Sequence, residues 1–496
     1  MMDLWQLPPE AEWWTFGFIL AGLALVLGLG EVVRKKRGWS SEFSRKLVHI
    51  AVGILAAFTP AFFTVPLPPI LLAMLFIIVN AIAIRSGLLP GIHAVDRTSY
   101  GTVYYPIAFL LLLVFFWYQE PVIISLSILV LALGDSSAAI VGESFRNPSY
   151  YRLTSDRKSI EGSIAMALVS FVVLLAGLML SMDMEHIPLE YVIACAGVAS
   201  VTATACEAIS SRGLDNLTIP LSTAIVLSFF LLPQSSTNVY QLTIGVSFGI
   251  FIAVASLKAG LLTSSGSVAT FLLAVVVFGI GGWQWTIPLV TFFVLSNLLS
   301  RTGSARKAEL QTARERIEGR DHQQVFANGG IGGILALVSY WYPELNLYPV
   351  FVGSVAAVTA DTWGTELGLL ARGRTVRLSD WKSVTPGSNG GVSFVGFMAG
   401  LCGSAVIAAS SSVWLDSGLL AWILLAGIAG SIVDSILGGT LQADFRCPVC
   451  GILTSQRVHC NNQPTVLMSG FAWLNNDGVN WVCAFTGAAV MGIVVL

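Results

Sequence analysis

Residues 70–84 read ILLAMLFIIVNAIAI, with Asn80 as the one polar side chain. Roughly 20 apolar residues span a bilayer as an α-helix, and apolar stretches of this kind recur along the chain. The chain is 55% apolar, 11% of its 496 residues are charged, and its mean hydropathy is +0.78. The sequence therefore predicts an all-α polytopic membrane protein. We expect about sixteen spans, starting near residues 13, 47, 66, 103, 121, 162, 190, 217, 239, 260, 285, 324, 348, 391, 418 and 479.

The basic residues segregate into alternate loops when these spans are threaded in order. One set of loops contains no Lys or Arg, and the other set contains all 26 of them, within 34–46, 85–97, 146–158, 301–320, 372–382 and 446–457 and at Arg212 and Lys258. Cytoplasmic loops carry the excess of Lys and Arg in membrane proteins. The pattern predicts a multi-pass protein, in the plasma membrane if bacterial, with both termini outside and its polar motifs on the cytoplasmic face.

Composition excludes little else. The formal net charge of -2 says nothing useful about nucleic acid or the membrane surface, and we expect no nucleic-acid partner. Residues 1–14 carry only acidic charges, and basic residues follow the first apolar stretch, so we expect no cleaved signal sequence. The seven cysteines do not form a disulfide framework, because a reducing cytoplasmic face favours free thiols or a metal.

The sequence divides into two similar halves, which we expect to be two parallel repeats of about eight spans each, 1–235 and 236–496. An acid ends the fifth span of each half, at Asp135 and at Asp361. A polar loop then ends in Lys-Ser, at Lys158-Ser159 and at Lys382-Ser383. A second acid ends each seventh span, at Glu207 and at Asp434. A polar stretch precedes each eighth span, namely Asp215-Asn216 in the first half and 476–480 in the second.

These repeated residues have the chemistry of a site for a Mg²⁺-nucleotide. Acids at the mouths of membrane helices need a cavity or a partner, and Mg²⁺ uses carboxylate oxygens while it binds phosphates. Lys followed by Ser and Gly at a helix start offers a cation, hydroxyls and N–H groups to an anion. Neither a P-loop nor a Rossmann motif is present. The alternative is that each acid only caps a helix. The predicted Mg²⁺ ligands are Asp135, Asp361 and Asp434, and the first anion site comprises Lys158, Ser159, Glu161, Gly162 and Ser163.

Other polar residues have weaker patterns. His49 lies one helical turn from Arg45 and beside Lys46, and it could accept the proton of a hydroxyl; the alternative is a buried polar residue near an interfacial anchor. Arg301 could hold phosphate, and Asn328 could contact a ligand.

Cysteines in the last polar loop resemble a zinc knuckle. Cys447 and Cys450 form a CxxC pair, and His459 and Cys460 follow it. Such a set supplies the four ligands of a zinc site. Neighbouring residues such as His459 and Cys460 are awkward ligands for one ion, so a metal-free loop is the alternative.

Two family resemblances follow from these motifs. Arg45-Lys46 with His49, the Gly134-Asp135 pair, and Lys158-Ser159 through Ser163 resemble the phytol kinase and dolichol kinase family, over about residues 40–232. That family uses CTP to phosphorylate isoprenoid alcohols in membranes. Residues 240–496 are similar to the integral membrane family that contains phytyl-phosphate kinases. The second resemblance implies further binding residues at Thr362, Glu366, Ser383, Gly387, Ser388, Asn389, Asn476, Asp477 and Asn480.

Together the resemblances imply a fusion of two kinases that converts an isoprenoid alcohol, such as phytol or geranylgeraniol, to its monophosphate and then its diphosphate. Catalysis would involve His49, Asp135, Lys158, Asp361 and Lys382, with Mg²⁺ and CTP or another nucleoside triphosphate. The expected partners are the alcohol, its phosphate and the bilayer. Open alternatives are a single-step polyprenol kinase or cytidylyltransferase with one inactive half, and a transporter.

Overall fold

The computed structural model describes residues 4–37, 41–86, 99–181, 187–232, 239–303, 319–370, 373–460 and 463–496. Contacts divide the chain into two compact units, Met1–Thr243 and Ile244–Leu496, called unit 1 and unit 2 below. The boundary expected after residue 235 falls at 233–238, outside the described residues. That each half carries one activity stays a prediction.

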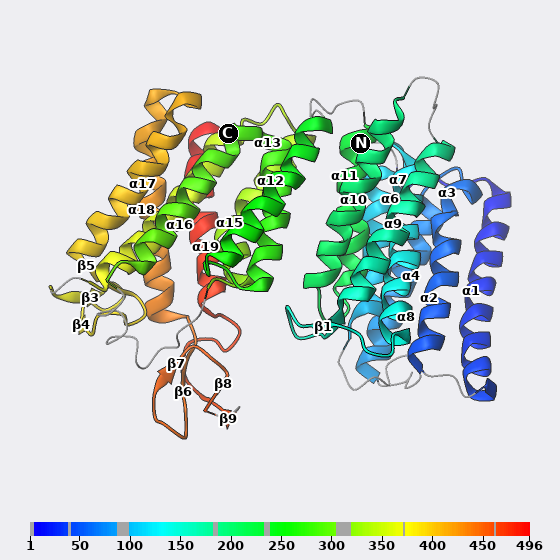
Figure 1. Ribbon diagram of the computed structural model, residues 1–496, viewed down its shortest axis with the longest axis horizontal. Coiled ribbons are helices and arrows are strands. Elements are labelled where there is room, and N and C mark those ends of the chain that lie inside the picture. The colour runs from blue at the N-terminus through cyan, green and yellow to red at the C-terminus, as the bar shows by residue number, and fades with distance from the viewer. Residues whose placement is uncertain are drawn as a thin grey trace. The chain divides into compact units, whose positions relative to one another are not determined.

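Unit 1 is built from helices at each of the positions expected from hydropathy (Figure 1). A continuous helical segment, Pro121–Ser144, runs through its interior and comprises α7, η1 and α8. Helix α7 is apolar on all sides and contacts α2, α6, α9 and α11, as expected for a helix without a lipid-facing side. The elements are α1 (Glu10–Arg37), α2 (Ser41–Ala57), α3 (Thr59–Phe62), α4 (Leu67–Ser86), α6 (Gly101–Phe116), α7 (Pro121–Leu129), η1 (Val130–Asp135), α8 (Ser136–Ser144), β1 (Tyr150–Tyr151), β2 (Lys158–Ser159), α9 (Ile160–Ser181), α10 (Leu189–Ile209) and α11 (Asp215–Leu231).

Unit 2 is also helical, with small strands in its polar loops (Figure 1). Its elements are α12 (Val239–Lys258), α13 (Ser264–Arg301), α15 (His322–Trp341), α16 (Tyr348–Gly368), β3 (Thr375–Arg377), β4 (Ser383–Val384), β5 (Gly391–Ser393), α17 (Phe394–Ser411), η2 (Ser412–Trp414), α18 (Ser417–Thr440), β6 (Asp444–Arg446), β7 (Leu453–Thr454), β8 (Val458–His459), β9 (Gln463–Pro464), β10 (Val466–Ser469) and α19 (Asn476–Val495).

The core of unit 2 forms around α16, which packs against α17, α18 and α19. Small residues allow this close approach, because helices in membranes associate through packing of their backbones. A Cβ on Gly353 of α16 would lie 2.6 Å from the carbonyl oxygen of Gly487 in α19. Around the same helix, Phe351 is fully buried and its ring lies 4.7 Å from that of Trp285.

Ten helices in the described part of the chain are long and apolar enough to cross a membrane. The fold is therefore that of a multi-pass helical membrane protein. Helix α13 has 38 residues and is broken at Gly282, whose φ of 58° is non-helical, between the two spans expected from near residues 260 and 285. The full count of sixteen spans, the repeat and the orientation of the termini stay predictions.

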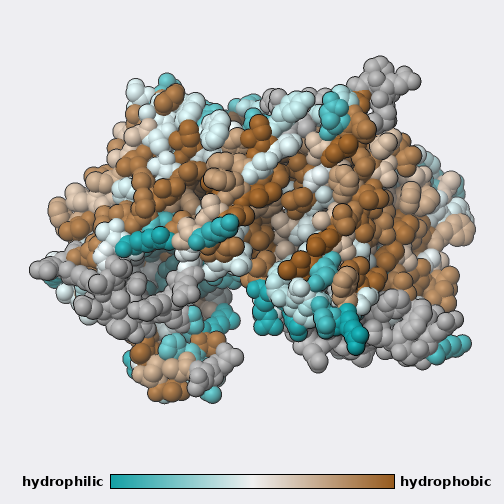
Figure 2. Space-filling model, viewed as in Figure 1, coloured by the Kyte–Doolittle hydropathy of each residue, from teal (hydrophilic) through white to brown (hydrophobic). Residues whose placement is uncertain are grey.

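Short antiparallel sheets, which the sequence did not predict, organise the polar loops. Strand β1 pairs with β2, β3 lies between β4 and β5, β6 lies between β10 and β7, and β8 pairs with β9. Apolar side chains cover the helices of each unit, whereas in unit 1 hydrophilic residues gather at the end where β1 lies (Figure 2). The candidate catalytic groups of unit 1 lie near this end.

Candidate active sites

Unit 1 contains an apolar cavity of about 570 Å³. Its walls come from α1, α2, α4 and α6, and most of its lining is aliphatic or aromatic, including Leu23, Val52 and Phe109. Polar residues also line it: Ser44, Arg45, His49, Thr59, Asn80, Thr102, Tyr105 and Asn216. A pocket of this size and composition suits a small-molecule ligand that is largely hydrocarbon with one polar end.

His49 connects this cavity to the acid that ends η1. His49 and Lys46 share one face of α2, since they are one helical turn apart. The Lys46 ammonium donates to Asp135 Oδ2 at 2.5 Å, and His49 Nε2 lies 4.0 Å from the same oxygen. His49 Nε2 and the Tyr105 hydroxyl are both buried without a hydrogen-bond partner in the described chain. Two buried polar atoms beside an apolar cavity are therefore positioned to bind a hydroxyl group.

The backbone at Asp135 is unusual. Residues Val130–Asp135 form a π-helical stretch between α7 and α8. Such stretches are rare and often occur at functional sites. The Ser137 hydroxyl donates to the carbonyl of Gly134 within this turn, at 2.6 Å.

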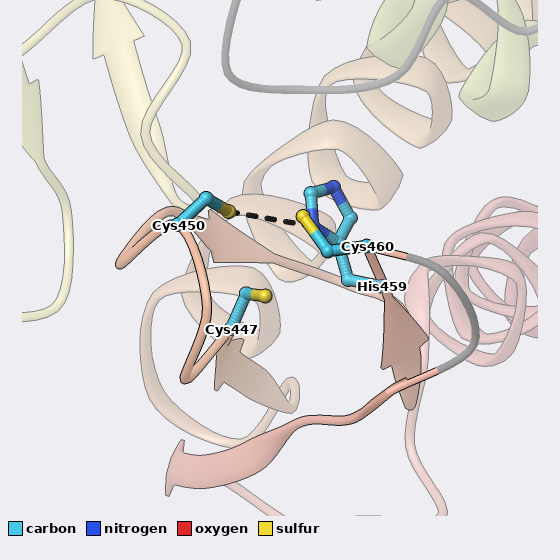
Figure 3. Close-up of side chains that lie close together, drawn as sticks. All are labelled: Cys447, Cys450, His459 and Cys460. Atoms are coloured by element: carbon cyan, nitrogen blue, oxygen red, sulfur yellow. Dashed lines mark hydrogen bonds between the residues drawn. The ribbon is translucent and has the colours of Figure 1, made fainter.

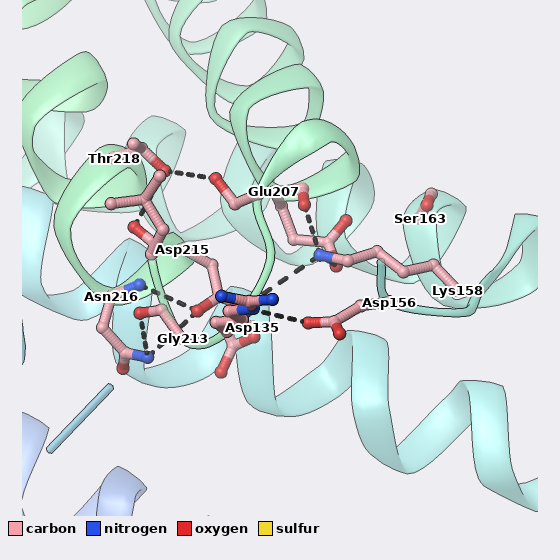
Figure 4. Close-up of polar contacts among 12 residues, drawn as sticks. Asp135, Asp156, Lys158, Ser163, Glu207, Gly213, Asp215, Asn216 and Thr218 are labelled. Atoms are coloured by element: carbon pink, nitrogen blue, oxygen red, sulfur yellow. Dashed lines mark hydrogen bonds and ion pairs between the residues drawn. The ribbon is translucent and has the colours of Figure 1, made fainter. Parts of the chain in front are cut away.

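Lys158 lies in a second charged cluster of unit 1 (Figure 4). Its ammonium lies 2.6 Å from Glu207 Oε1 and 3.9 Å from Asp215 Oδ2, and it also donates to the carbonyl of Glu207. Burial lowers the pKa of Lys158, but the carboxylates of Glu207 and Asp215 together raise it further, so the net pKa is raised. Lys158 also interacts electrostatically with Asp135, which joins the two charged clusters. The acidic surroundings therefore favour the charged form of Lys158.

Asp215 and Asn216 join this cluster to the apolar cavity. Asn216 lines the cavity and donates to Asp215 Oδ1 at 3.0 Å. The preceding turn contains two left-handed residues, Arg212 and Gly213, which place α11 with Asp215 at its first turn. The Asp215-Asn216 pair is a repeated feature of the sequence, but its position in the site was not predicted. Tyr105 and Asn80 were not predicted either, although isolated polar residues within apolar spans were the available signal.

The remaining predicted residues of the first anion site have structural partners. Ser159 Oγ accepts from the Gly162 N–H at 3.1 Å, so it caps α9. The Glu161 carboxylate accepts from the Ser149 N–H at 3.0 Å, and Ser163 shares a hydrogen bond of 2.6 Å with the Tyr151 hydroxyl. These contacts fix the Lys158 loop onto α9.

Unit 2 contains a second, more polar cavity of about 480 Å³. Asp361 of α16 and Asp434 of α18 line it, and their carboxylates interact electrostatically. The other predicted residues in its lining are Gly387, Ser388, Asn389 and Asn476. The structure thus brings together residues from four separate segments of the chain.

The acids of the second cavity fit a divalent cation. Asp434 Oδ2 is buried without a hydrogen-bond partner in the part of the chain that the structure describes. The described lining contains no Lys or Arg that would neutralise the two acids. Hydroxyl and amide oxygens of Ser388, Asn389 and Asn476 are further hard ligands of the kind that Mg²⁺ takes. In unit 1 the fit differs. Lys46 already pairs with Asp135, whereas Glu207 Oε2 is buried and has no hydrogen-bond partner within the described ranges.

Other predicted residues of unit 2 lie elsewhere. Lys382 is 77% exposed and pairs with Asp380 at 3.3 Å, so the structure does not bring it to Asp361. Ser383 is exposed in β4. The other predicted residues make local contacts: Arg301 donates to the Ala259 carbonyl, Glu366 accepts from Ser300, Asn328 donates to the Gln324 carbonyl and Asp477 accepts from Asn475. Thr362 and Asn480 are half-buried and do not line the cavity.

The cysteine-rich loop gathers its four predicted ligands (Figure 3). One ligand atom each from Cys447, Cys450, His459 and Cys460 lies within 4.8 Å of the others. Hydrogen bonds from the backbone of Cys450 and Val449 lower the pKa of the Cys447 thiol to about 6. None of these four residues is part of the lining of either cavity.

Comparison with known proteins gives the family. The phytol kinase of Synechocystis sp. is 31% identical to this chain over 218 residues, which are 43% of this chain and 90% of that protein. This chain belongs to the phytol kinase family. Phytol kinase 1, chloroplastic, of Arabidopsis thaliana is 30% identical over 234 residues, 43% of this chain and 75% of that protein.

Further matches agree with an integral membrane protein. Residues 247–488, which lie within unit 2, match the family described as integral membrane protein DUF92. Protein PGR of Arabidopsis thaliana is 29% identical to this member of the phytol kinase family over 271 residues, 49% of this chain and 92% of that protein. No solved structure matches.

Proposed function

We propose that this chain is an isoprenoid alcohol kinase in which unit 1 phosphorylates the alcohol and unit 2 phosphorylates the resulting monophosphate. The observation that carries the first step is the apolar cavity of unit 1. At its polar end lies the buried His49 Nε2, 4.0 Å from Asp135 and without a hydrogen-bond partner among the described residues. A hydrocarbon chain fits the apolar walls, and a single hydroxyl group fits the polar end. The relatives named phytol kinase support an alcohol of this class.

In unit 1 the proposed chemistry is a phosphoryl transfer. The substrate hydroxyl gives its proton to His49 Nε2 while its oxygen bonds to the terminal phosphorus of the nucleotide. The bond from that phosphorus to the bridging oxygen breaks, and the nucleoside diphosphate leaves. Asp135 stabilises the imidazolium that forms, since a carboxylate near a histidine favours its charged form. Such general-base assistance typically contributes 10²–10⁴-fold in rate.

The phosphates of the nucleotide would lie beside Lys158. This cation is mostly buried and already surrounded by Glu207, Asp215 and Asp135, so binding a triphosphate there requires extra positive charge. Mg²⁺, held by Glu207 and Asp215, would supply it and would neutralise the charge that develops during transfer. The family resemblance supports CTP as the phosphoryl donor.

Unit 2 suits a substrate that is already charged. Its cavity is lined by two acids together with the turn Pro386–Gly391, which includes the polar residues Ser388 and Asn389. Mg²⁺ held by Asp361 and Asp434 would bind the phosphates of both the nucleotide and the monophosphate. This arrangement supports the second phosphorylation and is the observation that favours a bifunctional enzyme.

The test is a product assay on purified full-length protein with phytol, CTP and Mg²⁺, read by mass spectrometry. We expect phytyl phosphate, then phytyl diphosphate, and one CDP for each transfer. His49→Ala should stop use of the alcohol but still convert added phytyl phosphate. Asp434→Ala should leave alcohol phosphorylation intact, so that monophosphate accumulates.

Each alternative gives a different result. If either folded variant lost both steps, the proposal of two separate sites would be wrong, and one composite site would have to carry out both reactions. Monophosphate as the end product in the wild type, with added monophosphate also unused, would leave a single-step alcohol kinase. Transfer of a cytidylyl group would release pyrophosphate instead of CDP, and a transporter would release neither.

A further inference from the structure

The cysteine-rich loop between α18 and α19 has the geometry of a closed metal site. Cys447 and Cys450 lie on the turn between β6 and β7, His459 ends β8, and Cys460 follows it (Figure 3). His459 Nδ1 lies 3.5 Å from Cys450 Sγ and 3.2 Å from Cys460 Sγ. Around a tetrahedral zinc ion, a nitrogen and a sulfur ligand lie about 3.6 Å apart, given the usual Zn–N and Zn–S distances. The observed spacing therefore needs little adjustment.

The turn that carries the first two cysteines points both sulfur atoms the same way. The Gly451 N–H donates to the Cys447 carbonyl at 2.9 Å, and the Cys447 N–H donates to the Ile452 carbonyl at 3.0 Å. Gly451 has a φ of +72°, a backbone conformation that glycine adopts without steric cost. The tight turn thereby directs the Cys447 and Cys450 side chains toward His459.

The neighbouring ligands His459 and Cys460 also point to one place. Consecutive side chains of a strand project to opposite faces, which normally prevents two neighbours from binding one ion. Cys460 has a φ of +39°, in the left-handed region that non-glycine residues rarely adopt. This turn in the backbone brings its sulfur back to the side of His459, and such local strain is found where a site requires it.

We propose that Cys447, Cys450, His459 and Cys460 bind one structural zinc ion. Three thiolates and one imidazole form a soft to borderline donor set that selects zinc over Mg²⁺. Because the protein fills all four tetrahedral positions, the ion has no open position for substrate and has a structural role.

The surrounding segment needs such a cross-link. Strands β8, β9 and β10 are largely exposed, and the sheets around them are too small to bury an apolar core. Small segments of this kind are commonly stabilised by a metal. Asp444 of β6 accepts a hydrogen bond of 2.9 Å from Asn389, which lines the cavity of unit 2. The zinc-bound segment would therefore support one wall of that cavity.

The test is the metal content of full-length protein, purified in detergent without chelators and without a histidine tag. Elemental mass spectrometry should find about one zinc ion per chain. Cys450→Ser should reduce the zinc content at least tenfold, and His459→Asn should also lower it. Cys402→Ser is the matched control, because Cys402 is an exposed cysteine outside the cluster. This variant should keep its zinc.

The gel-filtration profile in detergent serves as the fold control, since a local loss of zinc should leave it unchanged. Zinc content does not depend on catalysis, so it remains decisive even if the proposed kinase steps fail. The proposal is overturned by wild-type protein that holds no zinc after incubation with Zn²⁺ under reducing conditions. Iron in place of zinc, a Cys447–Cys450 disulfide, or full zinc retention in Cys450→Ser would overturn it too.

Discussion

At the scale of single residues, the charge balance of unit 1 depends on Lys158. Its side chain is 12% exposed and pairs with Glu207, which is 8% exposed. Removing one partner of a buried ion pair leaves an uncompensated charge and costs about 3–5 kcal/mol. We therefore expect Lys158→Met to lower the midpoint of thermal unfolding in detergent. Lys158→Met combined with Glu207→Leu should recover much of the stability but not the kinase activity.

Lys382→Met is the matched control for this prediction. Lys382 is 77% exposed, and substitutions at exposed positions usually change stability by less than about 0.5 kcal/mol. Equal shifts of the unfolding midpoint in the two single variants would contradict the assigned role of Lys158.

The acids of both sites could be located from the sequence, but their partners could not. In the sequence, Asp135, Glu207, Asp361 and Asp434 each follow an apolar stretch, which is a local and readable signal. The contact between Lys46 and Asp135 joins residues 89 positions apart and depends on how α2 and η1 are rotated about their axes. The outward position of Lys382 depends on the path of its loop. Hydropathy contains no information on either property.

At the scale of elements, the turn Pro386–Gly391 forms part of the second cavity because it lies directly on α18. Gly390 has a φ of +71°, and a Cβ there would lie 2.5 Å from the carbonyl oxygen of Ser435 and 2.6 Å from the backbone nitrogen of Gly439. We expect Gly390→Ala to displace the turn and to slow monophosphate phosphorylation at least about 10-fold, since small misplacements of binding groups are costly.

Gly373→Ala is the control, because a Cβ at Gly373 would meet no atom of the described residues within 4 Å. Kinetics of the monophosphate reaction, measured for both variants beside alcohol phosphorylation, check the prediction. A Gly390→Ala enzyme with unchanged second-step kinetics would show that this turn does not position substrate.

Helices were predictable at this scale, whereas the strands were not. A span of about 20 apolar residues gives a strong signal, and helices occur at each expected position of the described chain. The strands have two to four residues each, too few for an alternating pattern to stand out from a loop. The π-helical stretch at Asp135 has only six residues, which is too short for a recognisable periodicity in the sequence.

At the scale of the whole molecule, the prediction that all basic loops share one face can be tested by labelling. Asp416 and Arg152 are both exposed in the structure, so accessibility to water does not distinguish them. A membrane-impermeant maleimide applied from outside should label Asp416→Cys above the level of the parent chain. Arg152→Cys should be labelled only after the membrane is opened.

Labelling of Arg152→Cys in sealed cells would contradict the predicted orientation. The experiment also tests the number of spans, because one additional or missing crossing would reverse the expected result for every later loop. Sequence alone does not give the number of spans. About sixteen are expected from hydropathy, whereas ten of the described helices are long and apolar enough to cross a membrane.

Helix α1 separates the cavity of unit 1 from its surroundings by a single layer of side chains. Ile19 and Leu23 line the cavity, while Phe18 and Leu25 on the same helix are 74% and 61% exposed. In a bilayer these outer side chains face lipid, so we expect the alcohol to enter by lateral diffusion. The effective concentration of substrate is then its mole fraction in the lipid or detergent phase. Adding inert detergent at constant total phytol and enzyme should slow the reaction by surface dilution.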